Sequence, residues 1–179
     1  PGSNPDFGMA ESHAYMEKSV RRMKDLNCTI TRFHWAQDGN RLALMDSLGI
    51  FVQEELSWWQ GPYKELSPSL METAKRQLSE LIEAHYNHPC IFAWGMSNEV
   101  GNNHEHILEL AAHTRSLDGT RIVDAVSNGI YSTLDKDPSL VLDLPTWNEY
   151  MGTWHGESRN DLLTSMPKVA NVLNGRPLL

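Results

Sequence analysis

The sequence predicts an α/β fold, namely a (β/α)8 barrel that is present only in part. Three observations favour this fold class. Short apolar runs typical of strands alternate with amphipathic segments typical of helices, which indicates a parallel sheet. The expected strands are apolar enough to be buried on both faces. Polar and aromatic residues follow the ends of successive strands, where barrels of this class carry their active sites.

Length and composition are those of one globular domain. The chain has 179 residues, of which 40% are hydrophobic, and we expect one domain over residues 1–179. A complete eight-stranded barrel needs about 250 residues, so the chain is short for one. The net charge of −8 repels polyanions, so nucleic acid is not an expected partner. No apolar run approaches the roughly 18 residues of a membrane span, and the sequence does not fix a compartment.

The first half of the chain predicts two helix–strand pairs and an aromatic loop. An apolar stripe that includes Leu26 marks the first helix, and β-branched residues mark the strand after it. Gly49 is a natural end for the second helix, because glycine readily adopts a left-handed conformation. In order, we expect a helix at 11–26, a strand at 28–34, a helix at 41–48, a strand at 50–54 and the loop at 55–67.

The second half continues this alternation. Ser67 and Pro68 favour a helix start, since serine caps the first turn and proline fits within it. The last helix is expected to bury Leu163 and Met166 despite Pro167. In order, we expect a helix at 67–85, a strand at 90–98, a helix at 105–116, strands at 121–125 and 139–143, an aromatic loop at 147–156, a helix at 160–173 and the start of a strand at 176–179.

The stretch Cys90–Glu99 carries the main functional signal. It is typical of a buried strand, and it ends on an adjacent amide and carboxylate, Asn98 and Glu99. A carboxylic acid that protonates a leaving oxygen near neutral pH needs a raised pKa, which apolar walls such as Trp94 would supply. Asn98 could bind a sugar hydroxyl beside it. The alternative is that Glu99 caps the helix that follows.

Two further groups of residues fit a carbohydrate site. Arg32 and His34 alternate along one strand and so share a face, from which each could bind a substrate oxygen. The alternative for Arg32 is a structural ion pair with Glu54 or Glu99. Sugar rings present apolar C–H faces that stack on aromatic rings, although such rings can equally pack on a barrel rim. The loop aromatics are Trp58, Trp59, Tyr63, Trp147, Tyr150 and Trp154.

Motifs for metal binding and for serine or cysteine nucleophiles are absent from the sequence. The chain has eight histidines, but no zinc motif is present, and His104 and His106 would project in different directions. We therefore expect no metal and no cofactor. No Gly-x-Ser-x-Gly motif occurs, and Cys28 and Cys90 open strands instead of ending them. We expect two buried free thiols, with a disulfide as the alternative.

Five stretches of the sequence resemble glycoside hydrolase family 2, the family of β-galactosidases, β-glucuronidases and β-mannosidases. The stretch at 88–99 resembles the acid/base strand of that family and is the most specific of the five. The others resemble the family's strand 2, strand 3, lead into strand 5 and strand-6 loop. In that order they are 23–34, 45–55, 118–121 and 148–154.

The resemblance implies a (β/α)8 TIM barrel of which this chain holds about strands 2 to 6 and the start of strand 7. It implies a retaining exo-glycosidase that acts on β-glycosides, with Glu99 as general acid and then general base. It also implies that Asn98 binds the hydroxyl next to the anomeric carbon. The pocket would be lined by Arg32, His34, Asn148, Tyr150 and Trp154.

The chain departs from the family pattern in two places. Magnesium-binding β-galactosidases of the family carry Glu-x-His in the loop after strand 3, where this chain has Ser57–Gly61, so no metal is assigned here. The family's nucleophilic glutamate stands at the tip of strand 7, which we expect just beyond Leu179.

Two other classes of function stay open beside the glycosidase. The first is a non-catalytic carbohydrate-binding or assembly module on the same fold. The second is a metal hydrolase that uses His104 and His106. A partial barrel also leaves open sheet edges, so we expect a homo-oligomer such as a dimer, a barrel completed by another chain, or further residues outside 1–179.

Overall fold

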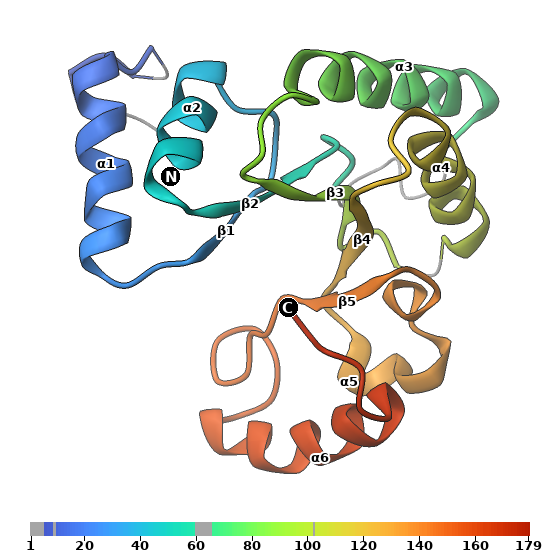
Figure 1. Ribbon diagram of the computed structural model, residues 1–179. Helices are drawn as coiled ribbons and strands as arrows, with labels where there is room; N and C mark the ends of the chain where they lie inside the picture. The colour runs from blue at the N-terminus through green and yellow to red at the C-terminus, as the bar shows by residue number, and fades with distance from the viewer. Residues whose placement is uncertain (1–5, 9, 60–65, 102) are drawn as a thin grey trace.

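Strands and helices alternate along the chain (Figure 1). The structure is a computed structural model that describes residues 6–8, 10–59, 66–101 and 103–179. The strands are β1 (Ile30–Phe33), β2 (Phe51–Glu55), β3 (Ile91–Asn98), β4 (Ile122–Ser127) and β5 (Leu144–Trp147). The α-helices are α1 (His13–Asp25), α2 (Gly39–Leu48), α3 (Pro68–His85), α4 (His104–Leu117), α5 (Ile130–Thr133) and α6 (Leu162–Leu173). Three short 3-10 helices are η1 (Leu134–Lys136), η2 (Pro138–Val141) and η3 (Arg159–Asp161).

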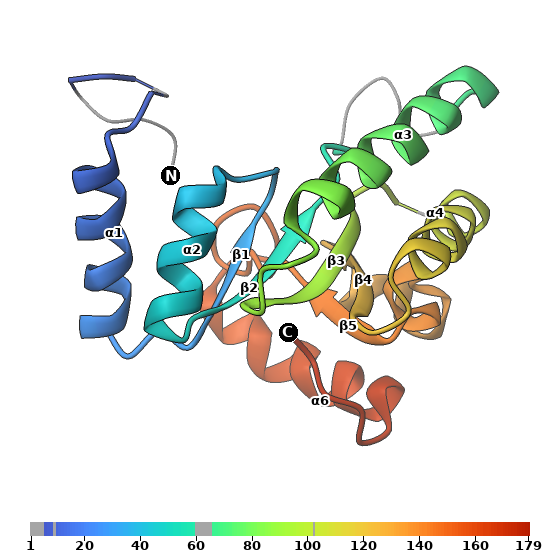
Figure 2. The same cartoon turned by 45° about the horizontal axis from the view of Figure 1, so that its top comes forward.

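The strands form one five-stranded sheet in the order β1-β2-β3-β4-β5, and every neighbouring pair is parallel. Each connection between neighbouring strands contains a helix, as parallel pairing requires. In both views the helices lie along the outside of the curved row of strands, with α1 packed on α2 and α3 on α4 (Figures 1 and 2). The sheet is therefore an open segment of a (β/α) barrel, and the predicted α/β fold is confirmed.

The last residue of the chain extends the sheet beyond β5. The backbone N–H of Leu179 donates to the carbonyl of Pro145 over 3.0 Å, and the N–H of Trp147 donates to the carbonyl of Leu179 over 2.9 Å. This pairing agrees with the strand start that the sequence predicts at 176–179. At the other edge of the sheet lies β1.

Helix boundaries follow the capping residues that the sequence predicts. The hydroxyl of Ser67 accepts from the backbone N–H of Leu70, and Pro68 occupies the first turn of α3. Gly49 ends α2 in a left-handed conformation with a φ of 64°, which carries no steric penalty for glycine. These local signals place α2 and α3 within two residues of their expected bounds.

The strand predicted at 139–143 is wrong. This stretch lies instead mostly in η2, and the strand β5 begins only at Leu144. Asp137 explains the difference, because its carboxylate accepts from both the backbone N–H and the hydroxyl of Ser139 and so closes a tight turn at Pro138. Side-chain capping therefore overrides the apolar pattern of the segment.

Three apolar residues that the sequence places inward are exposed. Leu26 lies just past the end of α1 and is 81% exposed, while Leu163 and Met166 are 74% and 40% exposed. The buried face of α6 runs instead through Ser165, Val169 and Leu173. Leu163 and Met166 lie beside that face.

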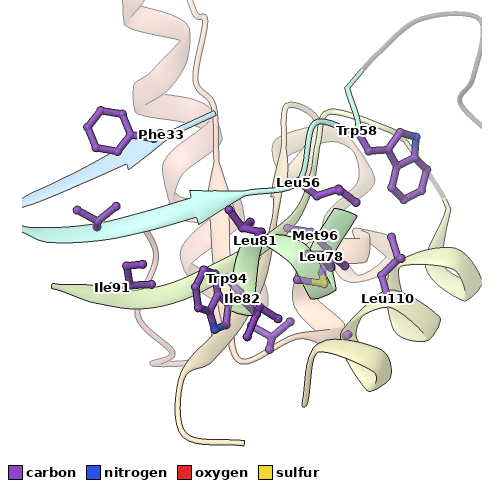
Figure 3. Packing of buried hydrophobic residues seen from close by; sticks show 14 of the residues in the cluster. Phe33, Leu56, Trp58, Leu78, Leu81, Ile82, Ile91, Trp94, Met96 and Leu110 are labelled. Atoms are coloured by element: carbon purple, nitrogen blue, oxygen red, sulfur yellow. The ribbon is translucent and has the colours of Figure 1, made fainter. Parts of the chain in front are cut away.

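The main hydrophobic core lies between the helices and the outer face of the sheet. Trp94 of β3 is fully buried in this core, and its indole N–H donates to Asp118 over 2.9 Å. Figure 3 shows residues of this core from β1, β3, α3, α4 and the segment after β2. Those labelled in the figure include Leu56, Trp58, Leu78, Leu81, Ile82, Ile91, Met96 and Leu110.

Within the described ranges, no helix is long and apolar enough to cross a membrane. Cys28 and Cys90 are both free, so the thiol interpretation is confirmed over the disulfide, but only Cys90 is buried and Cys28 is half-buried.

Candidate active site at the carboxyl ends of the strands

Glu99 lies immediately beyond β3 and is 6% exposed. Its backbone N–H donates to the carbonyl of Val126 in β4, so the residue is held between two strands. Its φ of 56° is left-handed, a conformation that a residue with a long side chain rarely adopts. The N-cap position of α4 belongs to Asn103, so Glu99 is not placed as the cap of that helix.

Three side chains from other segments donate to the Glu99 carboxylate. The Tyr150 hydroxyl donates to Oε1 over 2.5 Å, and Nδ2 of Asn148 donates to the same oxygen over 2.7 Å. Nδ2 of Asn128 donates to Oε2 over 3.4 Å. Burial raises the pKa of Tyr150 to about 12, with the Glu99 carboxylate adding to the shift, so the phenol stays a donor at neutral pH.

Arg32 of β1 binds the two asparagines of the site. One guanidinium nitrogen donates to Oδ1 of Asn98 over 2.6 Å, and another donates to Oδ1 of Asn148 over 3.2 Å. The amide nitrogen of Asn148 also donates to Oδ1 of Asn98 over 2.9 Å. Arg32, Asn98, Asn148, Tyr150 and Glu99 thus form one hydrogen-bonded group that spans β1, β3 and the loop after β5.

Glu55, the last residue of β2, accepts two further hydrogen bonds from Arg32. Its two oxygens accept from Nε and from a terminal nitrogen of Arg32 over 3.0 and 3.1 Å, and it is only 1% exposed. Burial raises the pKa of Glu55, while the Arg32 guanidinium opposes this shift and favours the carboxylate. His34 lies beside this pair, with Nε2 3.6 Å from Oε1 of Glu55, and burial lowers its pKa so that the ring is neutral at pH 7.

A second polar group occupies the inner face of the sheet, which is the face turned away from the helices. The carboxylate of Asp124 in β4 accepts from Gln53 of β2 over 2.9 Å and from Thr146 of β5 over 2.8 Å. Burial raises the pKa of Asp124 to about 7, and the bonds from Thr146 and Gln53 oppose that shift. A Cβ on Gly95 of β3 would lie 2.8 Å from Cγ of Glu55 and 3.0 Å from Nε2 of Gln53, so only glycine leaves room for the side chains of β2 here.

The aromatic residues are divided between the site and the core. Trp154 is 75% exposed and its ring lies 4.8 Å from that of Tyr150. Trp59 is 48% exposed, pairs through its backbone with Asn98, and meets His34 edge to face at 5.9 Å. Trp58 is buried against His106. Trp147 stacks on Tyr131, and Tyr63 lies outside the described residues.

The structure therefore brings together most of the residues that the sequence singles out. Glu99, Asn98, Arg32, Asn148 and Tyr150 share direct hydrogen bonds, whereas His34 and Trp154 lie at the margin of the group. These placements do not assign roles, which stay predictions.

The sequence indicates no role for Asn128. It places Glu55 and Asp124 among the polar residues at the strand ends but assigns them no contacts, and the ion pair it offers for Arg32 is wrong. Arg32 binds Glu55 instead of Glu54 or Glu99. Glu54 is not available to Arg32 because its side chain faces the helices, where Oε2 lies 2.7 Å from Nδ1 of His85. The alternation of side chains along a strand could have shown that only one of the two glutamates pairs with Arg32. Adjacent residues point to opposite faces of the sheet, so only one of Glu54 and Glu55 can share the face of Arg32.

Among the described residues, no group of three or more His, Cys, Asp and Glu side chains is placed to hold a metal ion. His106 is half-buried and meets the buried Trp58 edge to face, with the ring centroids 6.3 Å apart. Part of the loop that would carry the family's Glu-x-His motif, at residues 60–61, lies outside the described ranges.

Fold and site together define a protein of the (β/α)-barrel class with a carboxylate-centred polar site at the carboxyl ends of its strands. Residues 2–164 match the family described as glycosyl hydrolases family 2, TIM barrel domain, and the chain belongs to this family.

Similar proteins agree with this membership. The chain is 32% identical over 173 residues to a β-glucuronidase of Bacteroides fragilis. The aligned region covers 91% of this chain and 24% of that protein. It is 30% identical over 152 residues to a β-galactosidase of Thermoanaerobacterium thermosulfurigenes, covering 83% of this chain and 20% of the other. The chain thus spans about a quarter or less of these curated relatives.

Solved structures show the same fold. A β-glucuronidase of Bacteroides uniformis superposes with a TM-score of 0.83 at 25% identity, over 99% of this chain and 23% of the other. A family 2 β-galacturonidase of Eisenbergiella tayi, bound to galacturonate, superposes with a TM-score of 0.85 at 25% identity, over 98% of this chain and 33% of the other. The five-stranded sheet is a half-barrel of the TIM-barrel type, as predicted.

Proposed function

We propose that these residues are part of a retaining glycoside hydrolase that cleaves terminal β-O-glycosidic bonds, with Glu99 as acid/base. The observation that carries the proposal is the position of Glu99, a buried carboxylate at the tip of a barrel strand with donors bound to both oxygens. Family membership supports the same chemistry.

The proposed reaction has two steps. In the first, Glu99 gives its proton to the glycosidic oxygen as that oxygen leaves, while a second carboxylate attacks the anomeric carbon and forms a glycosyl ester. In the second, Glu99 removes a proton from water, the water oxygen bonds to the same carbon, and the ester bond breaks. The sugar is released with its original configuration and Glu99 is protonated again.

The second carboxylate must lie about 5–5.5 Å from the first. Glu55 is held at both oxygens by Arg32, and Glu54 faces away towards His85. Glu149 accepts from the backbone of Met151. Following the resemblance to the family, we propose that the nucleophile is a glutamate on the next barrel strand, which Leu179 begins beside β5.

The proposed substrates are β-glycosides of sugars such as glucuronate or galactose, which the names of the relatives suggest. Asn98 would bind the hydroxyl next to the anomeric carbon. Trp154 and Tyr150 would contact the apolar face of the sugar, and His34 and Arg32 would complete the pocket.

A second candidate is a carbohydrate-binding module that performs no catalysis. The observation that favours it is the exposure of Trp59 and Trp154 beside the polar group, because stacking on these rings needs no acid. Sugar binding that survives Glu99→Gln, with no turnover in the natural full-length polypeptide, would support this candidate.

The test of the proposed function uses Glu99→Ala in the natural full-length polypeptide. For aryl β-glycosides with poor leaving groups, kcat/KM should fall about 100-fold or more, because general acid catalysis contributes at least that much. Substrates with a dinitrophenol leaving group need no proton and should lose far less in kcat/KM. Azide should restore turnover and give a β-glycosyl azide.

Glu157, which is exposed, provides the control variant Glu157→Ala, and its kcat/KM should equal that of the wild type. Equal losses for good and poor leaving groups in Glu99→Ala, without rescue by azide, would exclude the acid/base role.

A further inference from the structure

Glu55 has no role in the proposed reaction, yet it is among the most completely buried polar side chains of the described chain. Both of its oxygens are bonded to Arg32. A charged pair of this kind is not needed to fill space, because an apolar pair of similar size would often be as stable. The bonds that Arg32 makes beyond Glu55 indicate what the pair does.

Arg32 fixes which way two amide groups point. A guanidinium can only donate, so the amide atom that faces it must be oxygen. This requirement sets Oδ1 of both Asn98 and Asn148 towards Arg32. Nδ2 of Asn148 is then directed to Oδ1 of Asn98 and to Glu99.

The orientation of Asn98 leaves its amide N–H groups free. All of the hydrogen bonds of this side chain within the described ranges are accepted by Oδ1, from Arg32 and Asn148. Nδ2 therefore presents donors next to Glu99, where a sugar oxygen would lie. If the amide were reversed, Oδ1 would face the sugar and the amide nitrogen would face the guanidinium, which repels it.

We propose that Glu55 is a positioning residue that acts through Arg32 to hold the Asn98 amide with its N–H groups towards the substrate. In this role it determines how strongly the site prefers a sugar with a hydroxyl beside the anomeric carbon over its 2-deoxy counterpart. The inference rests on the proposed function only for the identity of the ligand. The orientation of the amides stands on the contacts among Arg32, Asn98 and Asn148.

Gly95 offers a second, independent way to test the position of Glu55. A Cβ at this position would meet Cγ and Cβ of Glu55 at 2.8 and 3.0 Å and Nε2 of Gln53 at 3.0 Å. Because the Gln53 atom is the end of a flexible side chain, the variant Gly95→Ala chiefly displaces Glu55, without removing its carboxyl group. Asp124 is a matched control, since it is equally buried on the same face but bonds to Gln53 and Thr146 instead of Arg32.

The first experiment measures binding by isothermal titration calorimetry. The probes are methyl β-D-glucuronide and methyl β-D-galactoside, each beside its 2-deoxy analogue. The wild type should prefer the 2-hydroxyl sugar by about tenfold, the value of one good hydrogen bond. In Glu55→Gln and Gly95→Ala the preference should fall below about threefold, while in Asp124→Asn it should stay at the wild-type value.

A purely structural role of Glu55 would weaken both sugars equally and leave their ratio unchanged. A wild-type ratio retained in Glu55→Gln and Gly95→Ala would therefore overturn the proposal. The conservative variant Glu55→Asp keeps the charge and should recover part of the preference.

The second experiment needs no ligand. The side-chain amide signals of Asn98 and Asn148 in a ¹H–¹⁵N NMR spectrum should shift in Glu55→Gln and not in Asp124→Asn. Unshifted signals in a folded Glu55→Gln protein would overturn the inference. Shifted signals without binding of any glycoside would uphold the positioning role and contradict the proposed function instead.

Discussion

Tyr150 donates a 2.5 Å hydrogen bond to Oε1 of Glu99, and this contact joins the loop after β5 to the tip of β3. Asn148, from the same loop, donates to the same oxygen. The carboxylate is thus fixed by residues about fifty positions away in sequence before any substrate is bound. The loop is as much a part of the candidate site as the strand.

We expect Tyr150→Phe to lower the free energy of unfolding by about 1–2 kcal/mol, because the variant loses one hydrogen bond to a buried carboxylate. In a double-mutant cycle with Glu99→Gln, urea denaturation should give a coupling energy of about 1 kcal/mol between the two residues. Tyr131→Phe is the control, since the Tyr131 ring stacks on Trp147. That change should stay within about 0.5 kcal/mol, and a zero coupling energy would contradict the contact.

Asp124→Asn should change how stability depends on pH. Burial raises the pKa of Asp124 to about 7 in the folded chain, above its ordinary value of 3.8. Between these values the folded chain holds a proton that the unfolded chain releases, so this group makes stability fall as pH rises, by up to about 1.4 kcal/mol per pH unit.

Urea denaturation at pH 4.5, 5.5, 6.5 and 7.5 measures this effect as the difference between wild type and Asp124→Asn. The asparagine variant should lose less stability across the series, since its amide does not titrate. Parallel curves for the two proteins would show that Asp124 titrates normally.

The 179-residue chain should hydrolyse aryl β-glycosides no faster than its own Glu99→Gln variant does, because the nucleophile that we propose lies outside residues 1–179. Release of 4-nitrophenol from the β-glucuronide and the β-galactoside measures this. Turnover that depends on Glu99 would show that the nucleophile lies within these residues or comes from a second copy of the chain.

Leu78→Ala should destabilise the protein by about 2–5 kcal/mol, because Leu78 is fully buried between α3 and the sheet and the change leaves a cavity. Leu163→Ala, at a position 74% exposed, should change stability by less than about 0.5 kcal/mol. Thermal or urea denaturation followed by circular dichroism compares the two. Similar losses at both positions would mean that Leu163 is covered in solution by a partner or by a further part of the protein.

Local signals in the sequence predicted the elements that depend on local chemistry. Ser67 and Pro68 begin α3 and Gly49 ends α2, because capping needs only neighbouring residues. The wrong strand prediction at 139–143 also reflects local chemistry. The turn that forms there depends on the side chain of Asp137, which apolar periodicity does not take into account.

The candidate site was partly predictable for a different reason. Asn98 and Glu99 stand out because they end an apolar run, which is visible in the sequence itself. The partner of Arg32 is not visible in that way, because the choice between Glu54 and Glu55 depends on which of them shares a face with Arg32. The hydrogen bond between Gln53 and Asp124 joins residues 71 positions apart, and it has room only because Gly95 between them lacks a side chain. No local sequence pattern predicts such a contact.

The left-handed backbone of Glu99 sets its proposed acid/base role against the stability of the fold. A side chain at a φ of 56° costs about 1–2 kcal/mol that glycine would avoid and asparagine would reduce. Glu99→Asn should therefore melt higher than Glu99→Gln, although both lack the carboxylate. A directed-evolution screen for heat resistance alone would tend to discard the candidate acid, so thermostable variants of this chain should be selected with activity as a second criterion.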